Sequence, residues 1–283
     1  MEFYVGIYQN SHLKHVPSRF IYSYRRMRKR KSPYDIPEHL KWILDSGAFQ
    51  ELRLYGRYTF TPEEYFEYAL EKKPDFFVNM DYMCEPSQLL KTGLTVEEHQ
   101  KLSIENQITL GDLADEHGIE LIGTIQGWDL ADYLDHIDML KESDTLRKIM
   151  GIGSICRRSA DKKILQVLRI IRRNLPSWIK LHGFGVKTTI LQYRETYNYL
   201  DMCDSMAWSY EGRMKGVKKI GIGGSLNGKP CLAYNDLICN RNSDDCANCG
   251  LYMRKWAEKI ETLISKKENQ LRITSFINEE LKG

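Results

Sequence analysis

The feature that most constrains the fold of this chain is a regular order of short apolar segments and longer amphipathic ones. Eight segments rich in aromatic and β-branched residues, each typical of a strand, occur along the 283 residues. Most of them are separated by helical patterns, and eight strand–helix units are typical of an α/β protein that closes into a (β/α)8 TIM barrel. The segments are Phe3–Tyr8, Phe20–Tyr24, Trp42–Leu44, Phe76–Met80, Glu120–Ile125, Lys148–Gly153, Trp178–His182 and Met202–Ala207.

Several of the intervening helices have clear signals at their ends. Thr61 stands before Pro62 and three residues before Glu64, and the pair Thr95 and Glu98 repeats this spacing, so both are predicted capping boxes. The second helix is expected to end near Gly118. Further helices are predicted at Asp129–Glu142, Ser159–Leu175, Thr188–Leu200 and Leu251–Leu281.

Composition limits the class of protein. A hydrophobic fraction of 42% and a charged fraction of 28% are ordinary for a soluble globular protein. No apolar run approaches the ~20 residues of a membrane helix, and the first residues do not resemble a secretion signal. We therefore expect a cytoplasmic protein whose 7 cysteines are thiols or metal ligands rather than disulfides. The net charge of +3 does not by itself predict a nucleic-acid partner.

Polar or small residues stand where several of the predicted strands end. A single aspartate at such a position is more typical of a helix cap than of an active site. In α/β barrels, however, catalytic groups lie at the carboxyl ends of the strands, so the recurrence predicts an active site there. The residues are Asp45, Asp81, Gln126, Gly153, Gly183 and Asp204.

Three carboxylates and one amide at one rim favour a particular chemistry. Paired carboxylates suit reaction at an acetal-like carbon, where one attacks the anomeric carbon and the other protonates the leaving group. The third acid and the amide suit hydrogen bonds to the edge of a flat heterocycle, and glycines allow close approach of backbone N–H groups. The chain contains no Walker-type phosphate loop, no G-x-S-x-G elbow and no H-E-x-x-H zinc motif.

The residues around these positions resemble the motifs of the tRNA-guanine transglycosylases. The resemblance follows the family's order over about residues 42–250. Residues 45–50, Asp-Ser-Gly-Ala-Phe-Gln, resemble D-S-G-G-[FY]-Q; residues 125–127 resemble V-Q-G-G; residues 151–155 resemble V-G-G-L-A; residues 181–185 resemble L-M-G-V-G; and residues 201–206 resemble D-M-F-D-C-V.

This resemblance implies a role for each matched residue. Asp204 would be the nucleophile that attacks C1′ of the target nucleoside, and Asp45 would be the general acid/base. The base would be bound by Asp81, Gln126, Gly153 and Ser154, and stacked between Phe49 and His182, which stands where the family has Met.

Four cysteines, Cys231, Cys239, Cys246 and Cys249, lie close together in a stretch with turn-forming residues. Only the last two have the two-residue spacing typical of zinc ligands, so an iron–sulfur cluster and free buried thiols remain alternatives. The transglycosylases carry a structural zinc after their eighth strand, and the resemblance implies the same Zn²⁺ cofactor here. We expect one domain over residues 1–283, with a four-cysteine zinc subdomain and C-terminal helix at residues 225–283. The other cysteines, Cys84, Cys156 and Cys203, are predicted to be buried small hydrophobes.

The chain is short for a tRNA enzyme of this family and shows no added RNA-binding domain. It is more similar to the DNA-guanine transglycosylases (DpdA-like) of 7-deazaguanine systems, which exchange guanine in DNA for a base such as preQ0. Two basic runs near the predicted mouth suit contact with phosphates. Their residues are Arg25, Arg26, Arg28, Lys29, Arg30, Lys31, Arg157 and Arg158.

Three alternatives to a DNA enzyme remain open. One is a tRNA-guanine transglycosylase of the queuosine or archaeosine pathway. Another is a non-catalytic, nucleic-acid-binding accessory subunit, although both Asp45 and Asp204 are present. The third is a hydrolytic glycosidase, against which the base-edge groups Asp81 and Gln126 argue. The resemblance also implies a possible homodimer or helper protein.

Overall fold

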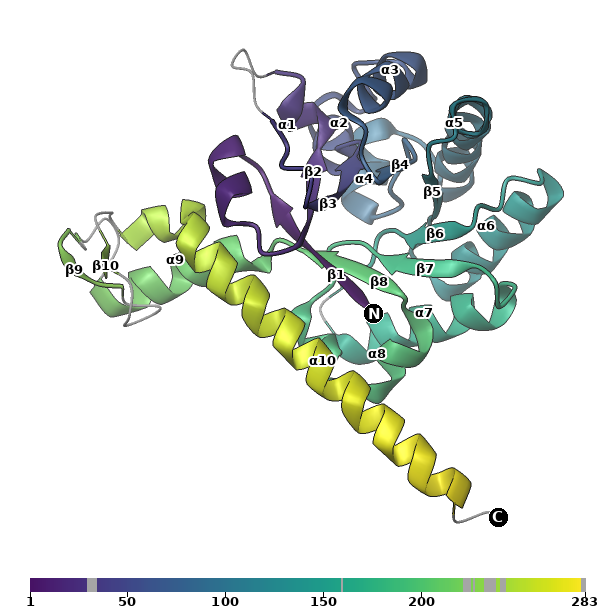
Figure 1. Cartoon of the computed structure of the whole chain (residues 1–283). Coiled ribbons are helices and arrows are strands. Elements are labelled where there is room, and N and C mark those ends of the chain that lie inside the picture. The colour runs from purple at the N-terminus through teal and green to yellow at the C-terminus, as the bar shows by residue number, and fades with distance from the viewer. Residues whose placement is uncertain are drawn as a thin grey trace.

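The computed structural model describes residues 1–29, 35–158, 160–220, 225, 227–231, 238–239 and 243–280. Its centre is a closed barrel of eight parallel strands that follow one another in chain order (Figure 1). The predicted α/β barrel is confirmed, and each predicted strand is present. The strands are β1 (Glu2–Ile7), β2 (Arg19–Ser23), β3 (Lys41–Asp45), β4 (Phe76–Val78), β5 (Leu121–Ile125), β6 (Ile149–Ile152), β7 (Lys180–Gly183) and β8 (Met202–Ser205).

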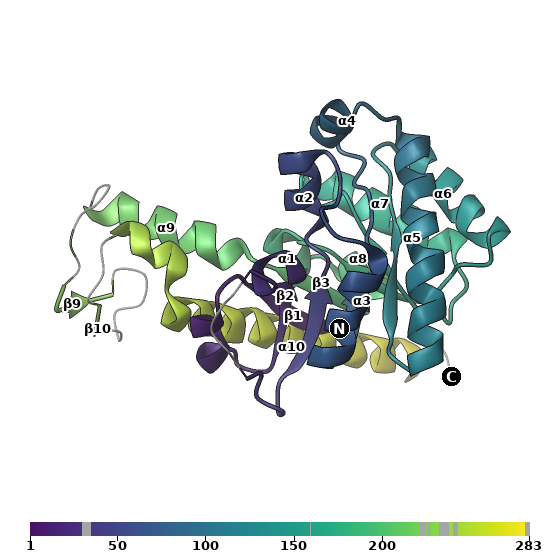
Figure 2. The ribbon, with the colours of Figure 1, turned by 90° about the horizontal axis from the view of Figure 1, so that it is seen from above.

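Helices follow the strands and cover the outside of the barrel (Figures 1 and 2). The α-helices are α1 (Tyr24–Met27), α2 (Ala48–Tyr55), α3 (Pro62–Lys72), α4 (Pro86–Thr92), α5 (Val96–His117), α6 (Leu130–Glu142), α7 (Asp161–Asn174), α8 (Arg194–Tyr199), α9 (Ala207–Ile220) and α10 (Gly250–Glu280). Three 3-10 helices are η1 (Asn10–His15), η2 (Thr188–Gln192) and η3 (Ser243–Asn248).

The predicted helix boundaries agree with the structure in most places. Thr61 and Thr95 both form complete capping boxes, and the helix that Thr95 begins ends at Gly118 in a left-handed conformation. The helix predicted over residues 188–200 is wrong as one element. Tyr193 has an extended backbone, with φ −90° and ψ 135°, and separates η2 from α8. Helices α1, α2, α4 and α9 were not predicted.

Strand alternation decides which residues point into the barrel. Tyr4, Ile43 and Met202 belong to one inner apolar cluster. Side chains two residues apart on a strand lie on the same face. Asp45 follows Ile43 by two residues on β3, and Asp204 follows Met202 by two on β8, so both point inward at the carboxyl rim.

Helix α9 extends away from the barrel, and α10 runs back along it (Figure 2). α10 packs against α9, η1, α8 and β1, and Trp256 of α10 lies 5.9 Å from Phe3 between ring centroids. Figure 2 shows α9 leading out to a two-stranded sheet of β9 (Lys229–Pro230) and β10 (Ile238–Cys239). Within the described ranges, none of the helices is both long and apolar enough to cross a membrane.

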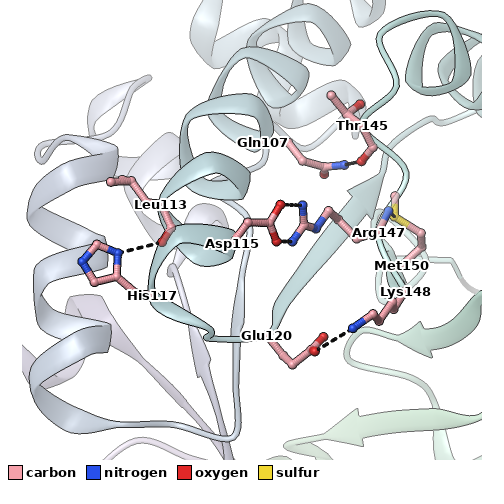
Figure 3. A network of polar contacts seen from close by, with 9 residues as sticks. All are labelled: Gln107, Leu113, Asp115, His117, Glu120, Thr145, Arg147, Lys148 and Met150. Atoms are coloured by element: carbon pink, nitrogen blue, oxygen red, sulfur yellow. Dashed lines mark hydrogen bonds and ion pairs between the residues drawn. The ribbon is translucent and has the colours of Figure 1, made fainter.

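The amino-terminal rim of the barrel is held by paired charges, as Figure 3 shows. Arg147, just before β6, forms a bidentate ion pair with Asp115, in which Nη1 donates to Oδ2 at 2.8 Å and Nη2 donates to Oδ1. Lys148 lies 3.2 Å from Glu120, which precedes β5. These charges therefore connect neighbouring strand–helix units, and each is matched by an opposite charge.

Candidate active site

A cavity of about 390 Å³ opens at the carboxyl rim of the barrel. Its size falls in the range of roughly 300–1,000 Å³ that is usual for small-molecule pockets. Asp45, Asp81 and Asp204 all border it, although they are far apart in the sequence. The structure therefore brings the three predicted carboxylates to one space. Other residues that border it include Ile21, Phe49, Val78, Met83, Gly153, Ser154 and Phe184.

Asp45 ends β3 and is partly buried. Burial and, to a smaller extent, the negative charge of Asp204 raise the pKa of Asp45 to about 6. Ser23, its register partner on β2, donates its hydroxyl hydrogen bond to Asp45, and the Gly47 N–H donates as well. Near neutral pH this carboxyl can therefore both give and take a proton, as a general acid/base requires.

Asp81 follows β4 and belongs to a buried chain of hydrogen bonds. Gln126 donates from Nε2 to Asp81 Oδ2, and Ser154 donates from Oγ to Gln126 Oε1 at 2.9 Å. The Cys84 N–H in turn donates to Ser154 Oγ at 3.1 Å. The amide of Gln126 is fully buried and does not border the cavity, so its contact with a ligand is indirect in this structure. Ser154 fixes the amide orientation, and the amide orients Asp81.

The environment of Asp81 also favours its protonated form. Burial, followed by the charge of Asp45, raises the pKa of Asp81 to about 7. Tyr58 donates its hydroxyl to the Asp81 backbone carbonyl at 2.9 Å and fixes the main chain at this position. Near neutral pH the carboxyl can therefore act as a donor or an acceptor toward a ligand.

Asp204 lies on β8 and is 8% exposed. His182 of the neighbouring β7 donates from Nε2 to Asp204 Oδ1 at 3.0 Å, and the Gly185 N–H donates to the same oxygen at 3.1 Å. Because both donors hold Oδ1, the second carboxylate oxygen is the one left for a substrate. Asp204 is thus a carboxylate held in place at the cavity wall, as a nucleophile would need to be.

Two glycines allow this close packing. Gly47 has φ 86°, and a Cβ there would lie 2.6 Å from Ser23 Oγ and 2.8 Å from Arg25 Cβ. A Cβ on Gly153 would lie 2.0 Å from Gln126 Nε2. Glycine is thus required at both positions, once for the turn after β3 and once for the approach of the buried amide.

The aromatic residues are arranged differently from the prediction. His182, the predicted stacking residue, is 0% exposed and does not border the cavity, and its side chain points toward Asp204. Phe184, two residues further along the chain, borders the cavity instead. Phe49 also borders it, and the Arg157 guanidinium lies 4.7 Å from its ring centroid.

The basic run after β2 does not act as one surface. Arg25, predicted to contact phosphate, is 7% exposed and pairs with the fully buried Glu51 at 2.6 Å. Arg28 donates to Thr59 and packs over the Phe60 ring at 4.5 Å. Arg26 is exposed and borders the cavity, and Lys29 is exposed. Arg30 and Lys31 lie outside the described residues.

The two arginines of the second basic run, Arg157 and Arg158, also differ in exposure. Arg157 is exposed, whereas Arg158 donates to the Trp128 carbonyl and lies 4.9 Å from the Trp128 ring centroid. Among the described residues, three of the predicted cations are solvent-exposed and could contact a polyanion: Arg26, Lys29 and Arg157.

The four clustered cysteines lie beyond α9. Burial, followed by the nearby thiols of Cys231, Cys239 and Cys249, raises the pKa of Cys246 to about 11. Among the residues that the structure describes, no group of three or more His, Cys, Asp or Glu side chains is arranged to hold a metal ion. A zinc site here stays a prediction. Cys84 and Cys203 are buried and Cys156 is partly buried, close to what the sequence predicts.

Sequence reasoning missed several residues at the cavity. For Phe184 the sequence offers one hint, the glycine at position 151. A Cβ there would lie 2.0 Å from the Phe184 ring, so the ring needs a glycine beside it. Tyr8 and Met206 border the cavity just beyond β1 and β8. Glu85 does not border the cavity, but it is 2% exposed beside Ser154, and its only sequence signal is that it precedes Pro86.

A closed α/β barrel with three carboxylates around one cavity at the carboxyl rim has the arrangement of a TIM-barrel enzyme, whose active site lies at this rim. The family model of DpdA, described as deoxypurine in DNA protein A, matches residues 1–278, and the chain belongs to this family. This membership supports a role as a DNA-guanine transglycosylase in 7-deazaguanine modification of DNA. No curated protein matches the chain.

Proposed function

We propose that this protein replaces guanine in DNA with a preQ0-type 7-deazaguanine base through a covalent intermediate on Asp204. The observation that carries the proposal is the shared cavity of Asp45, Asp81 and Asp204. Membership of the DpdA family supports DNA as the substrate.

In the first half of the reaction, the free oxygen of Asp204 attacks C1′ of the target nucleoside. The bond between C1′ and the base nitrogen breaks, and its electron pair leaves with guanine. Asp45, whose pKa of about 6 leaves part of it protonated near neutrality, gives a proton to the departing base. The product is a glycosyl ester of Asp204.

In the second half, the incoming base replaces guanine in the cavity. The Asp45 carboxylate takes a proton from the ring nitrogen, which attacks C1′ and displaces the Asp204 carboxylate. Each half is the reverse of the other in its proton transfer, so one acid/base residue serves both. Exchange differs from hydrolysis only in the acceptor: a second base, and not water, attacks C1′ in this step.

Asp81 would bind the donor edge of the purine. Its Oδ2 accepts from Gln126, and its Oδ1 would face the ring. Gly153 and Ser154 border the same cavity. The Gly153 N–H already donates to the Ile125 carbonyl and its carbonyl accepts from Tyr133, so the backbone of Ser154 is the part that would supply a further hydrogen bond. The target base must be flipped out of a duplex to reach this depth, with unstacking costing about a few kcal/mol.

The test is an exchange assay with labelled preQ0 and either DNA or tRNA. We expect label in DNA and a covalent protein–DNA adduct that is absent from the Asp204→Asn variant. Label that enters only tRNA would refute DNA as the substrate. Release of guanine without incorporation of label would favour hydrolysis over exchange.

We also propose that Cys231, Cys239, Cys246 and Cys249 bind a structural Zn²⁺. Thiolates are the ligands of closed zinc sites, and the raised pKa of Cys246 reflects in part the other three thiols near it. We expect about one zinc and no iron per chain by elemental analysis, with zinc lost in Cys246→Ser. Iron with acid-labile sulfide would indicate an iron–sulfur cluster instead.

A further inference from the structure

Helix α9 carries an exposed apolar stripe that begins at the cavity. Met206, directly before the helix, is 46% exposed and borders the cavity. Tyr210 is 71% exposed and Met214 is 47% exposed. Residues four apart lie on the same face of a helix. The three residues, here called the α9 stripe, therefore form one line from the mouth of the cavity along the helix.

The orientation of this stripe is fixed by the opposite side of α9. Trp208 is fully buried and donates from Nε1 to the Gly6 carbonyl at 2.8 Å. At Gly212 a Cβ would lie 2.8 Å from the Cys246 carbonyl oxygen, so α9 lies directly against η3. The side that carries the stripe is left uncovered by the described part of the chain.

The charge beside the stripe is positive. Arg213 is exposed on the same side of the helix, and no ion pair involves it among the described residues. Glu211, in contrast, accepts hydrogen bonds from Trp256 at 2.9 Å and Tyr252 at 3.3 Å on α10, and pairs with Lys215. Its negative charge is thus turned away and matched. At the mouth itself, Arg26 adds a second exposed cation.

We propose that the α9 stripe, together with Arg213, binds the DNA strand next to the target nucleotide. This inference rests on the proposed function, because it takes DNA as the polymer whose nucleotide enters the cavity. Tyr210 would stack on a neighbouring base, and Arg213 would contact a phosphate. Aromatic faces interspersed with cations are how proteins follow a single strand without reading its sequence.

A second copy of the chain is the competing occupant, and the charge argues against it. A two-fold contact places the same patch on both partners. Arg213 of one copy would then face the same positively charged patch on the other copy. A polynucleotide supplies the opposite charge, and its chain must leave the cavity through the mouth where Met206 stands.

The experiment compares Tyr210→Ala and Arg213→Ala with Trp178→Ala. Trp178 is a 60% exposed aromatic residue before β7, at the opposite rim, and serves as the matched control. The probes are a short labelled duplex and the single strand of the same sequence. Both contain guanine, with 2-aminopurine as its neighbour. Affinity is measured by fluorescence anisotropy at several salt concentrations, and subunit mass by light scattering.

We expect Tyr210→Ala to weaken binding about tenfold and to abolish the 2-aminopurine quenching that stacking produces. Arg213→Ala should lower the slope of log affinity against log salt by about 1 and leave the quenching in place. Trp178→Ala should match the wild type. Unchanged affinity and quenching in Tyr210→Ala would overturn the inference, as would a change of subunit mass without a change of affinity.

Failure of the stripe and failure of the proposed function give different results. If the wild type exchanges the base in DNA and Tyr210→Ala binds DNA equally well, only the inference about α9 is wrong. If Tyr210→Ala loses DNA binding but the wild type exchanges no base in DNA, the binding surface stands and the proposed reaction is wrong.

Discussion

The two rims of the barrel differ in whether their acidic side chains have a positively charged or hydrogen-bonding partner or lie close to another acid. At the amino-terminal rim, Arg147 is paired with Asp115 and Lys148 with Glu120, and Asp75 accepts the Trp42 N–H at 2.8 Å. At the carboxyl rim, Asp45 and Asp81 have raised pKa values because they are buried near another carboxylate. An acid with a positively charged partner stabilises the folded state. Acids buried close together destabilise it, and such groups with perturbed pKa values are concentrated at functional sites.

The largest effect should come from the nucleophile. We expect Asp204→Asn to lower base exchange by at least about 10³-fold, because the amide cannot form the glycosyl ester. Asp75→Asn is the same substitution at the other rim. It should keep exchange within about twofold and lower the free energy of unfolding by at most about 1 kcal/mol, since it changes one hydrogen bond.

The measurements for this pair are single-turnover exchange and urea unfolding. If Asp204→Asn kept its activity and Asp75→Asn lost it, the functional assignment of the two rims would be reversed.

The next largest effect should come from Asp45. Its substitution by Asn should lower exchange by about 10²–10⁴-fold, as loss of a general acid/base does. In the wild type, release of guanine needs the protonated acid, so its rate should fall as the pH rises through about 6, the raised pKa of Asp45. Attack by the incoming base needs the carboxylate, so this half should slow as the pH falls through the same value.

Separate single-turnover measurements of guanine release and of label incorporation test this pH dependence. Asp45→Asn should lose both transitions near that pH. A transition that remains in the variant would belong to another group.

A smaller effect should follow from Ser154→Ala. The substitution leaves Gln126 Oε1 without its donor in a buried site, so the amide and the Asp81 carboxyl lose their fixed orientation. An unmet buried acceptor costs about 1–3 kcal/mol, which predicts a KM for the incoming base raised about tenfold with a smaller change in kcat. Thr109→Ala removes a half-buried α5 hydroxyl that bonds only to the Glu105 carbonyl of its own helix, away from the cavity, and is the control. An unchanged KM would exclude the relay through Gln126.

The smallest effect should come from Arg147→Ala at the amino-terminal rim. Its partner Asp115 is well exposed, and such pairs contribute roughly 0.2–1 kcal/mol that salt reduces. We expect a loss of this size in the free energy of unfolding at low salt, less at high salt, and unchanged exchange. A drop in exchange with normal stability would show that the amino-terminal rim also serves the reaction.

Local sequence signals predicted much of the barrel. Thr61 and Thr95 define helix starts by contacts within one turn, so a single sequence reveals them. The strands are short runs of β-branched and aromatic residues, and their order with helices left few alternatives to a closed parallel barrel. The position of Asp45 directly after the apolar run Trp42–Leu44 placed it at the carboxyl rim without coordinates.

Contacts between distant segments were beyond this reasoning. Nothing near Arg25 in the sequence shows that Glu51 neutralises it, and nothing near His182 shows that it supports Asp204 rather than a base. The α9 stripe likewise depends on which side of the helix η3 covers.

The sequence by itself determined the order of the strands, the capped helices between several of them and the rim at which the aspartates stand, because each depends on residues within a few positions. The tertiary structure alone decided which arginines remain open, which aromatic rings face the cavity and how strongly each carboxyl is perturbed. Burial and the distance between charges set these properties, and both arise only when remote segments close the barrel.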